Sequence, residues 1–483
     1  MLLMWAASGI VLNHRKIVSS IDVPRKWLPT NYTPNNWNLA TVRSALLDKE
    51  GWVVWGNIGI WRCDSAFGNW RTFMDGIPKG MDNRRTMRVI QLSNGALYAA
   101  TQSGLYWSDR GDGWTKIELP LHDERIMDLS EAEGKIYVVS RSEVFILSIG
   151  NGEAKFEQIT LPPAHGDDGK ISLFRTLWVL HSGEVLGLAG KLIVDLLGFL
   201  LIFFVLTGYI YFLFPKWIRR RKRGGRNAEA LVKTNRFSIK WHNRLGLWLG
   251  GFLVFTALTG MFLRPPLLIA IAQSRVPKLK GTLLNNPNTW HDRLRVLRYS
   301  REGAYFLIVT NDGLYHTNNL VTEPARPYHT QPPLSVMGVN VLEQTKTGAW
   351  LIGSLNGLFI WNPAADSIKD FITGESLTNR PNVSSPIGNN MVAGFIPGGE
   401  VPLIFDYNRG LINQVLPMPE LIAQQPIPLW NLALEMHTGR IFQQWIGPFY
   451  ILVVPVIGVV ALLILLSGLV IYLRRNLTKK HSK

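Results

Sequence analysis

The chain has 483 residues, of which 47% are hydrophobic and 18% charged, and it carries a formal net charge of +17 with one cysteine, Cys63. A single thiol excludes an internal disulfide and a CxxC metal site. A chain this long and this apolar is typical of a protein with several domains and a membrane portion. No GxSxG, HExxH or Walker motif occurs, so hydrolase and nucleotide-binding chemistry have no support.

The N-terminal stretch MLLMWAASGIVLN is apolar and is followed by His14 and two basic residues. As a helix it would rise only about 20 Å, which is too short for about 30 Å of hydrocarbon. A signal peptide is one interpretation, but no basic residues precede the apolar ones. An alignment with residues 241–264 places Ser8-Gly9 opposite Thr259-Gly260. We therefore favour a partial first membrane helix, and the counterpart of His242 would lie in the missing half.

Two long segments have the pattern of β structure. Short runs rich in Val, Ile, Tyr and Trp end in Gly and an apolar or aromatic pair, as in ALYAATQSGLYWSD and AYFLIVTNDGLYHTN. Gly59 and Gly104 are 45 residues apart, and Gly313 and Gly357 are 44 apart, which is the repeat length of four-stranded propeller blades. About three units in each segment predict either one six-bladed propeller built from both segments or two separate three-unit sheets.

Three apolar runs are long enough to span a membrane, at 192–214, 245–263 and 449–473. Eleven basic residues against Glu229 lie between Lys216 and Arg244, and five more basic residues follow Leu473. Most of the positive charge therefore flanks the membrane helices, which predicts that these segments are cytoplasmic and that both β segments are outside. The same placement argues against nucleic acid as a partner.

The chain is thus interpreted as two tandem copies of a helix, an extracytoplasmic insert, a His-Gly segment and a second helix. The fold class is mixed: a four-helix transmembrane bundle, with its first helix truncated, and an all-β, propeller-like domain. The predicted parts are a partial helix (1–14), a β insert (15–170), a His-Gly segment with the second helix (171–215), a basic cytoplasmic loop (216–240), the third helix (241–264), a second β insert (265–428), a His-Gly segment with the fourth helix (429–473) and a basic tail (474–483).

Lys191 and Asp195 stand four residues apart near the outer end of the second helix. Ionised residues at membrane depth are usually paired or functional. We expect an ion pair within the helix that fixes its depth in the membrane.

The histidines recur with their surroundings. His181-Ser182-Gly183 matches His437-Thr438-Gly439, and both lie at the outer membrane boundary. His14 lies on the same side, whereas His242 lies at the inner mouth of the third helix. An imidazole at the boundary with a glycine two residues on suits an axial ligand of b-type haem, because it offers a neutral nitrogen and room for a flat macrocycle. A polar anchor bonded to a carbonyl or a lipid is the alternative for each histidine alone.

The membrane half resembles the PepSY-associated transmembrane proteins of bacterial inner membranes. The resemblance is carried by WHNRLGL at 241–247 with Leu258-Thr259-Gly260, by the two His-Gly motifs, by Leu206-Thr207-Gly208 and by Leu466-Ser467-Gly468 with Tyr472. That family includes ferric-siderophore reductases that hold b-type haem between helix histidines and pass electrons outward. The resemblance implies the same activity here.

The leading hypothesis is a multi-pass inner-membrane haem b protein, a ferric reductase that passes electrons from a quinone or cytoplasmic donor to a periplasmic acceptor such as a ferric siderophore. Its haem iron ligands are His181 and His437, with His242 as an inner-side ligand and His14 as a further outer-side candidate. The alternative is non-enzymatic: a propeller anchored in lipid that binds a periplasmic protein or peptide. A transporter is disfavoured, because only the fourth helix is interrupted by proline.

Overall fold

The computed structural model describes residues 1–109, 113–121, 125–150, 153–335, 338–377, 390–398 and 401–481. The chain divides into two compact units. A membrane unit comprises 1–18, 169–285 and 429–483, and a β unit comprises 19–168 and 286–428. Each unit therefore takes segments from both tandem copies.

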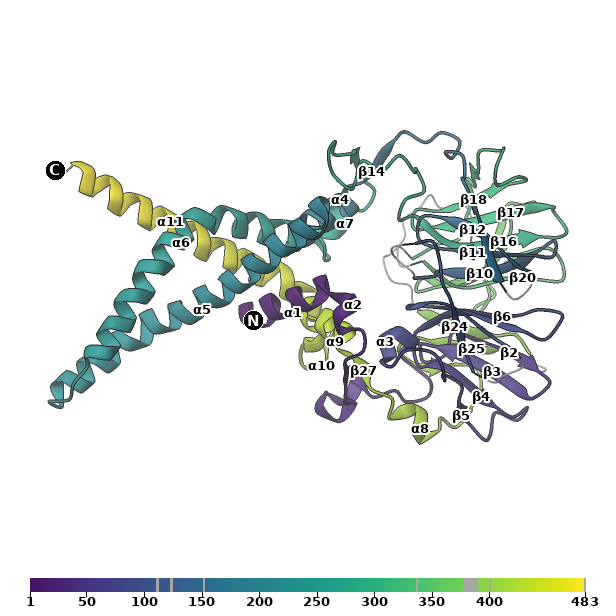
Figure 1. Cartoon of the computed structure of the whole chain (residues 1–483), viewed down its shortest axis with the longest axis horizontal. Helices are drawn as coiled ribbons and strands as arrows, with labels where there is room; N and C mark the ends of the chain where they lie inside the picture. Colours follow the sequence, from purple (N-terminus) through teal and green to yellow (C-terminus); the bar gives the residue numbers. More distant parts are fainter. Residues whose placement is uncertain are drawn as a thin grey trace. The chain divides into compact units, whose positions relative to one another are not determined.

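Three long helices dominate the membrane unit (Figure 1). They are α5 (Gly187–Arg223), α6 (Glu229–Met261) and α11 (Val453–His481). Within the described residues, the three candidate membrane spans are Glu184–Arg223, Glu229–Met261 and Arg440–Tyr472. The apolar runs expected to span the membrane thus lie in helices that are long enough to do so. The shorter elements of this unit are α1 (Leu2–Asn13), α2 (Arg15–Val18), β14 (Lys170–Ser172), α4 (Leu173–Ser182), η3 (Glu184–Leu186), α7 (Leu267–Ile271), β15 (Arg275–Pro277), α9 (Leu429–His437), η4 (Arg440–Phe442), α10 (Gln443–Ile446) and η5 (Gly447–Leu452).

The basic segment predicted as a loop over 216–240 is mostly helical, and that prediction is wrong. The helix α5 continues to Arg223 and α6 begins at Glu229, so that only residues 224–228 connect them. Lysine and arginine are good helix formers, and cations in the last turn of α5 interact favourably with the negative end of the helix dipole. Positive charge marks the end of the apolar run here and does not mark the end of the helix.

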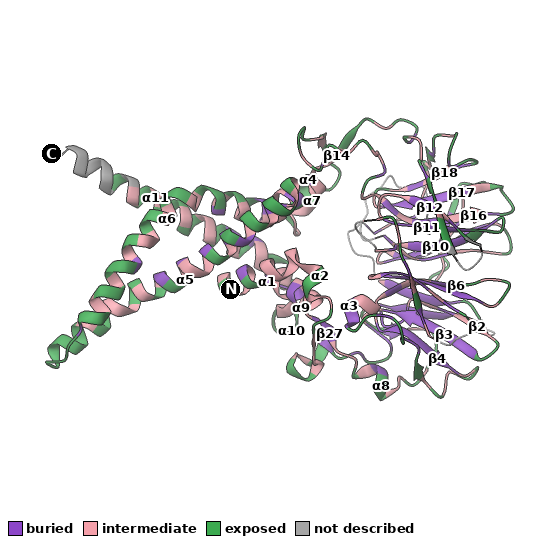
Figure 2. Cartoon of the chain, viewed as in Figure 1, coloured by how far each residue is buried: buried purple, intermediate pink, exposed green. Residues whose placement is uncertain are grey.

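The helices pack as α1 on α5, α5 on α6, and α6 on α11, while the short helices α9 and α4 pack on α1 and α6 respectively. Leu197, Leu200 and Phe204 of α5 form a small buried cluster with Leu253 of α6. Many other apolar side chains of these helices are exposed (Figure 2). Such a surface is suited to contact with lipid tails.

The β unit consists of antiparallel sheets. From the first insert, the described strands form three sheets: β2 (Ser44–Asp48), β3 (Gly51–Gly56), β4 (Gly59–Cys63) and β5 (Arg71–Thr72); β6 (Thr86–Gln91), β7 (Leu97–Thr101), β8 (Gly104–Ser108) and β9 (Thr115–Ile117); β10 (Asp128–Ala132), β11 (Lys135–Val139), β12 (Val144–Gly150) and β13 (Glu153–Ile159). From the second insert, they form three more: β16 (Leu294–Ser300), β17 (Tyr305–Thr310), β18 (Leu314–Thr317) and β19 (Arg326–Pro327); β20 (Val339–Gln344), β21 (Trp350–Ser354), β22 (Gly357–Asn362) and β23 (Ser367–Asp370); β24 (Val392–Ile396), β25 (Leu403–Asp406) and β26 (Gly410–Leu411).

The glycine spacing has a structural cause. Gly59, Gly104 and Gly357 each begin the third strand of a sheet, with φ of 86°, 140° and 142°, and Gly313 precedes β18 with φ of 153°. Only glycine adopts such angles at low cost, and each residue completes the tight turn that joins the second and third strands. The period of 44 or 45 residues therefore records one hairpin repeated in successive sheets.

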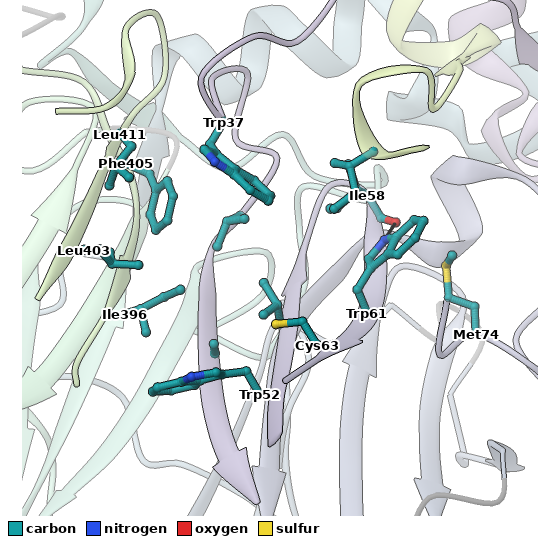
Figure 3. Packing of buried hydrophobic residues seen from close by; sticks show 14 of the residues in the cluster. Trp37, Trp52, Ile58, Trp61, Cys63, Met74, Ile396, Leu403, Phe405 and Leu411 are labelled. Atoms are coloured by element: carbon teal, nitrogen blue, oxygen red, sulfur yellow. Dashed lines mark hydrogen bonds between the residues drawn. The ribbon is translucent and has the colours of Figure 1, made fainter. Parts of the chain in front are cut away.

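Neighbouring sheets contact one another through their first strands. These contacts join β2 to β6, β6 to β10, β10 to β16, β16 to β20, β20 to β24, and β24 to β2. A buried core lies between the sheet that begins with β2 and the sheet that begins with β24 (Figure 3). Trp37, Trp52 and Trp61 from the first insert pack there with Leu403 and Phe405 from the second. The two inserts therefore share a hydrophobic core.

Backbone pairing and ion pairs also join the inserts. The strand β1 (Asp22–Val23) pairs with β27 (Ile427–Pro428). Asp128 of β10 forms a buried ion pair with Arg298 of β16, and Arg88 of β6 lies 2.8 Å from Glu343 of β20. Burial by itself would raise the pKa of Glu343, but the positive charges of Arg88 and Arg298 lower that pKa overall.

Candidate functional site

His181 lies in the last turn of α4, with its side chain against α6. The N-cap residue of the helix is Ser172, whose hydroxyl accepts a hydrogen bond from the Arg175 backbone N–H. The His181 Nδ1 atom lies 3.0 Å from the Thr256 carbonyl oxygen and 3.4 Å from Thr259 Oγ1. Because a carbonyl only accepts, Nδ1 carries the proton, and Nε2 keeps its lone pair.

His437 occupies the corresponding place at the end of α9, against α1. Its Nδ1 atom lies 3.1 Å from the Trp5 carbonyl oxygen and 3.1 Å from Ser8 Oγ. Trp5 and Ser8 are the counterparts of Thr256 and Thr259 when Ser8-Gly9 is aligned with Thr259-Gly260. The two tandem copies thus build the same pocket, but each histidine contacts a helix of the other copy.

A glycine allows each imidazole to approach its helix. A Cβ atom at Gly260 would lie 2.7 Å from Cε1 of His181, and one at Gly9 would lie 3.2 Å from Cε1 of His437. The glycines that follow the histidines have another role. Gly183 and Gly439 adopt φ of 77° and 72° and end α4 and α9 in the left-handed conformation. Gly260 and Gly9 thus admit the imidazole rings, whereas Gly183 and Gly439 end the helices that carry them.

The structure brings His181 and His437 together. Their ring centroids are 6.0 Å apart and the ring planes are inclined by 56°. Burial lowers the pKa of both imidazoles, and the pKa of His437 falls to about 4 because His181 and Arg264 are also close to it. Both side chains are therefore neutral at pH 7.

His242 and His14 have other partners. The His242 Nδ1 atom lies 2.8 Å from Thr207 Oγ1, and its ring is 5.0 Å from that of Phe204. The counterpart of Thr207 is Ser467. In the described part of the chain, Ser467 is hydrogen-bonded only to the Ile464 carbonyl.

His14 contacts Asp195, which corrects the predicted pair of Lys191 and Asp195. The Asp195 carboxylate lies 2.6 Å from His14 Nε2 and accepts a hydrogen bond of 2.9 Å from Asn13 Nδ2. Asp195 is buried between α5 and α1, where a carboxylate requires fixed hydrogen-bond donors. Asp195 therefore links α5 to the end of α1 and does not link two turns of α5.

Two charged residues that no sequence motif indicated lie near His437. Glu435 is buried and accepts two hydrogen bonds of 2.7 Å from Arg440. Arg264 follows α6 and influences the pKa of His437. A lone arginine after an apolar helix has the pattern of a membrane-boundary anchor, so no sequence signal distinguished it. Within the described residues, no group of three or more His, Cys, Asp or Glu side chains could hold a metal ion.

Apolar helices long enough to span a membrane, with recurring polar motifs at their ends, define this chain as a membrane protein. The family model described as the PepSY-associated TM region matches residues 140–475. The chain belongs to this family, as the motifs of its membrane half predicted.

The chain is also similar to the extracellular domains of two B. thetaiotaomicron proteins described as hybrid two-component systems, BT4673 and BT3049. The identities are 11% and 13%, and the TM-score is 0.34 in both cases. Each alignment covers 78% of this chain but only 39% and 40% of the other chains, so the chain spans about two fifths of their length. A likeness of this degree has no bearing on function. No curated protein matches the chain.

Proposed function

We propose that this protein is a b-type haem protein of the bacterial inner membrane that passes electrons to an extracytoplasmic acceptor. The observation that carries the proposal is the proximity of His181 on α4 and His437 on α9, whose ring centroids are 6.0 Å apart. The two histidines stand at matching positions of the two copies, and each donates a hydrogen bond from Nδ1 to a backbone carbonyl. The proposal therefore gives both the same role, as ligands of the haem iron.

The residues present fit a haem iron. An imidazole nitrogen lies about 2 Å from a bound transition metal, so two imidazoles on opposite sides of one ion have ring centres about 6 Å apart. The carbonyls of Thr256 and Trp5 each accept a hydrogen bond from Nδ1, which orients the ring and leaves Nε2 as the ligand atom. A bound haem supplies reversible one-electron transfer. His181 and His437 would hold it from its two faces.

The membrane topology that the proposal assumes is based on the placement of positive charge. The basic segments mark the cytoplasmic side, so His181 and His437 lie towards the outer side and the β unit is periplasmic. The donor would be a quinone or a cytoplasmic reductant, and the acceptor a ferric chelate such as a ferric siderophore. His242, with its Nδ1 bonded to Thr207, is a candidate ligand for an inner-side site. His14 is not included, because Asp195 engages its Nε2.

The β unit is proposed to be a single six-bladed propeller built from both inserts. Contacts between the first strands run from β2 through β6, β10, β16, β20 and β24 and return to β2, which supports a cyclic order. Replacing Asp128 with alanine, which leaves Arg298 buried without its partner, should then lower the stability of the whole β unit in a single transition. Two transitions, one of them unchanged, would favour two separate sheets.

Absorption spectroscopy of the purified full-length protein tests the haem proposal. Protein made with ample haem should have a Soret band that shifts on reduction, and His181→Ala or His437→Ala should abolish the bis-histidine spectrum. His165→Ala, at an exposed position of the β unit, is the control and should leave the spectrum unchanged. A colourless protein would refute the proposal. A periplasmic protein recovered with it in stoichiometric amount would then favour the non-enzymatic anchor.

A further inference from the structure

Arg264 lies one turn beyond the point where His181 contacts α6. The helix ends at Met261, and the backbone N–H of Arg264 donates to the Met261 carbonyl at 3.4 Å. Gly260, four residues before Arg264, is the residue whose absent side chain admits the His181 ring. Arg264 is therefore attached to the same end of α6 that forms one wall of the histidine site.

The guanidinium of Arg264 has no counter-ion of its own. It is partly buried, and among the described residues it has no hydrogen-bond or ion-pair partner. The Glu435 carboxylate is close enough to interact with the positive charge of Arg264, but Arg440 already binds both oxygens of Glu435. An arginine side chain remains protonated in proteins, so a positive charge is held beside His437 without a bonded anion. Such an arrangement costs free energy unless a ligand provides the anion.

The other tandem copy differs at this point. Asn13 is the counterpart of Arg264, and its amide donates to Asp195 at 2.9 Å. Arg175, on the helix that carries His181, is paired with Glu184 at 3.5 Å. Arg175 and Arg440 thus each pair with a glutamate, whereas Arg264 has no such partner in the part of the chain that the structure describes.

We infer that Arg264 binds a carboxylate group of the haem held between His181 and His437. This inference rests on the proposed function. A b-type haem carries two propionate carboxylates, and the planar guanidinium binds a carboxylate through two parallel hydrogen bonds. A lipid phosphate at the membrane boundary has similar anionic chemistry. The position of Arg264 beside the histidine pair favours the haem carboxylate.

Haem retention tests the inference without any measurement of activity. The full-length protein, Arg264→Gln and Arg264→Lys are each loaded with iron protoporphyrin IX or with its dimethyl ester, which lacks carboxylates. Release is followed from the loss of the Soret band. We expect Arg264→Gln to release the free acid about 10- to 100-fold faster, as for the loss of a hydrogen bond between charged groups, and Arg264→Lys to be intermediate. Arg175→Gln is the matched control and should release it at the wild-type rate.

The dimethyl ester separates a carboxylate contact from a structural role. Wild type and Arg264→Gln should release the ester at the same rate. A faster release of the ester from Arg264→Gln would overturn the inference, because Arg264 would then act through the fold. The inference would also be overturned if haem-free Arg264→Gln in phosphatidylcholine nanodiscs melted at a lower temperature than haem-free wild type. That result would indicate a lipid phosphate as the partner of Arg264. Equal retention of the free acid by both proteins would also overturn it and leave the haem proposal intact. A wild type that binds no haem would refute the proposed function itself.

Discussion

The two tandem copies of this chain build the same imidazole pocket and then differ around it. His181 and His437 each donate a hydrogen bond to a backbone carbonyl and rest on a Ser/Thr-Gly pair, at Thr259-Gly260 and Ser8-Gly9 respectively. Beyond the pockets, the first copy has a hydrogen bond between His14 and Asp195. The second copy has Arg264, whose guanidinium has no bonded carboxylate within the described part of the chain.

The comparison distinguishes features present in both copies, such as the imidazole pockets, from features present in one copy only. We interpret the features present in both copies as those that position the two imidazoles. A feature found in one copy serves a single side of the histidine site. The following substitutions test whether the shared and the individual features can be separated in this way.

Asp195→Ala should give the largest effect, a loss of about 2–3 kcal/mol in the free energy of unfolding. It removes a buried carboxylate that accepts hydrogen bonds from His14 and Asn13 and so joins α1 to α5. Denaturant titration of the full chain in detergent micelles measures it. Lys191→Ala, one turn earlier on α5, should cost less than about 0.5 kcal/mol. Equal losses in the two variants would mean that the pair within α5 is the important one.

Gly260→Ala should destabilise the membrane unit by about 1–3 kcal/mol, because its new Cβ would lie 2.7 Å from the His181 ring. Gly9→Ala brings its Cβ only to 3.2 Å from His437, and the gain in helix propensity offsets part of the strain. We expect its cost to stay below about 1 kcal/mol. Thermal unfolding of both variants gives the comparison, and a larger loss for Gly9→Ala would contradict the difference between the two pockets.

Thr207→Val should cost about 1 kcal/mol, because the His242 Nδ1 atom loses its hydrogen-bond partner in a partly buried position. Ser467→Ala is the corresponding change in the second copy. Its hydroxyl is hydrogen-bonded to the backbone of its own helix, so we expect a change within about 0.5 kcal/mol. Equal costs, measured by the same denaturant titration, would show that the hydrogen bond between Thr207 and His242 does not contribute to stability.

The ion pair of Arg88 and Glu343, which joins corresponding strands of the two inserts, should have the smallest effect. Since the pKa of Glu343 is lower in the folded state, its contribution to stability is present above the ordinary glutamate pKa and is lost as the pH falls through the lowered value. Both side chains are partly exposed, so we expect less than about 1 kcal/mol. Melting temperatures between pH 6 and pH 3 should fall more steeply for wild type than for Glu343→Gln. Identical slopes would mean that the pair of Arg88 and Glu343 does not contribute to stability in this pH range.

Features that repeat along the chain could be predicted from the sequence. The apolar runs in α5, α6 and α11 predicted the membrane helices because apolar length alone decides that property. Gly59, Gly104 and Gly357 predicted the repeated hairpins because their backbone angles exclude other residues. The recurrence of His181 and His437 predicted two equivalent positions, and the structure brings them together.

Features that depend on contacts distant in sequence could not be predicted. The spacing of Lys191 and Asp195 suggested a local pair, but burial against α1 gave Asp195 a partner 181 residues away in the chain. The basic residues after Lys216 suggested a loop because they indicate the membrane boundary, but a helix can continue beyond that boundary, as α5 does to Arg223. No sequence pattern indicated that Arg264 lacks a bonded carboxylate, because this depends on Arg440 binding Glu435.

The exchange of histidines between copies has a consequence for the order of events during synthesis. His181 is translated before the α6 residues that receive it, so its pocket can close once α6 has emerged from the ribosome. His437 contacts α1, which is translated well before α9, so the Ser8-Gly9 pocket stays open until His437 has been made, 429 residues after Ser8. A nascent protein interrupted in the second insert would carry one finished pocket and one open one. Completion of the second pocket therefore requires translation through α9.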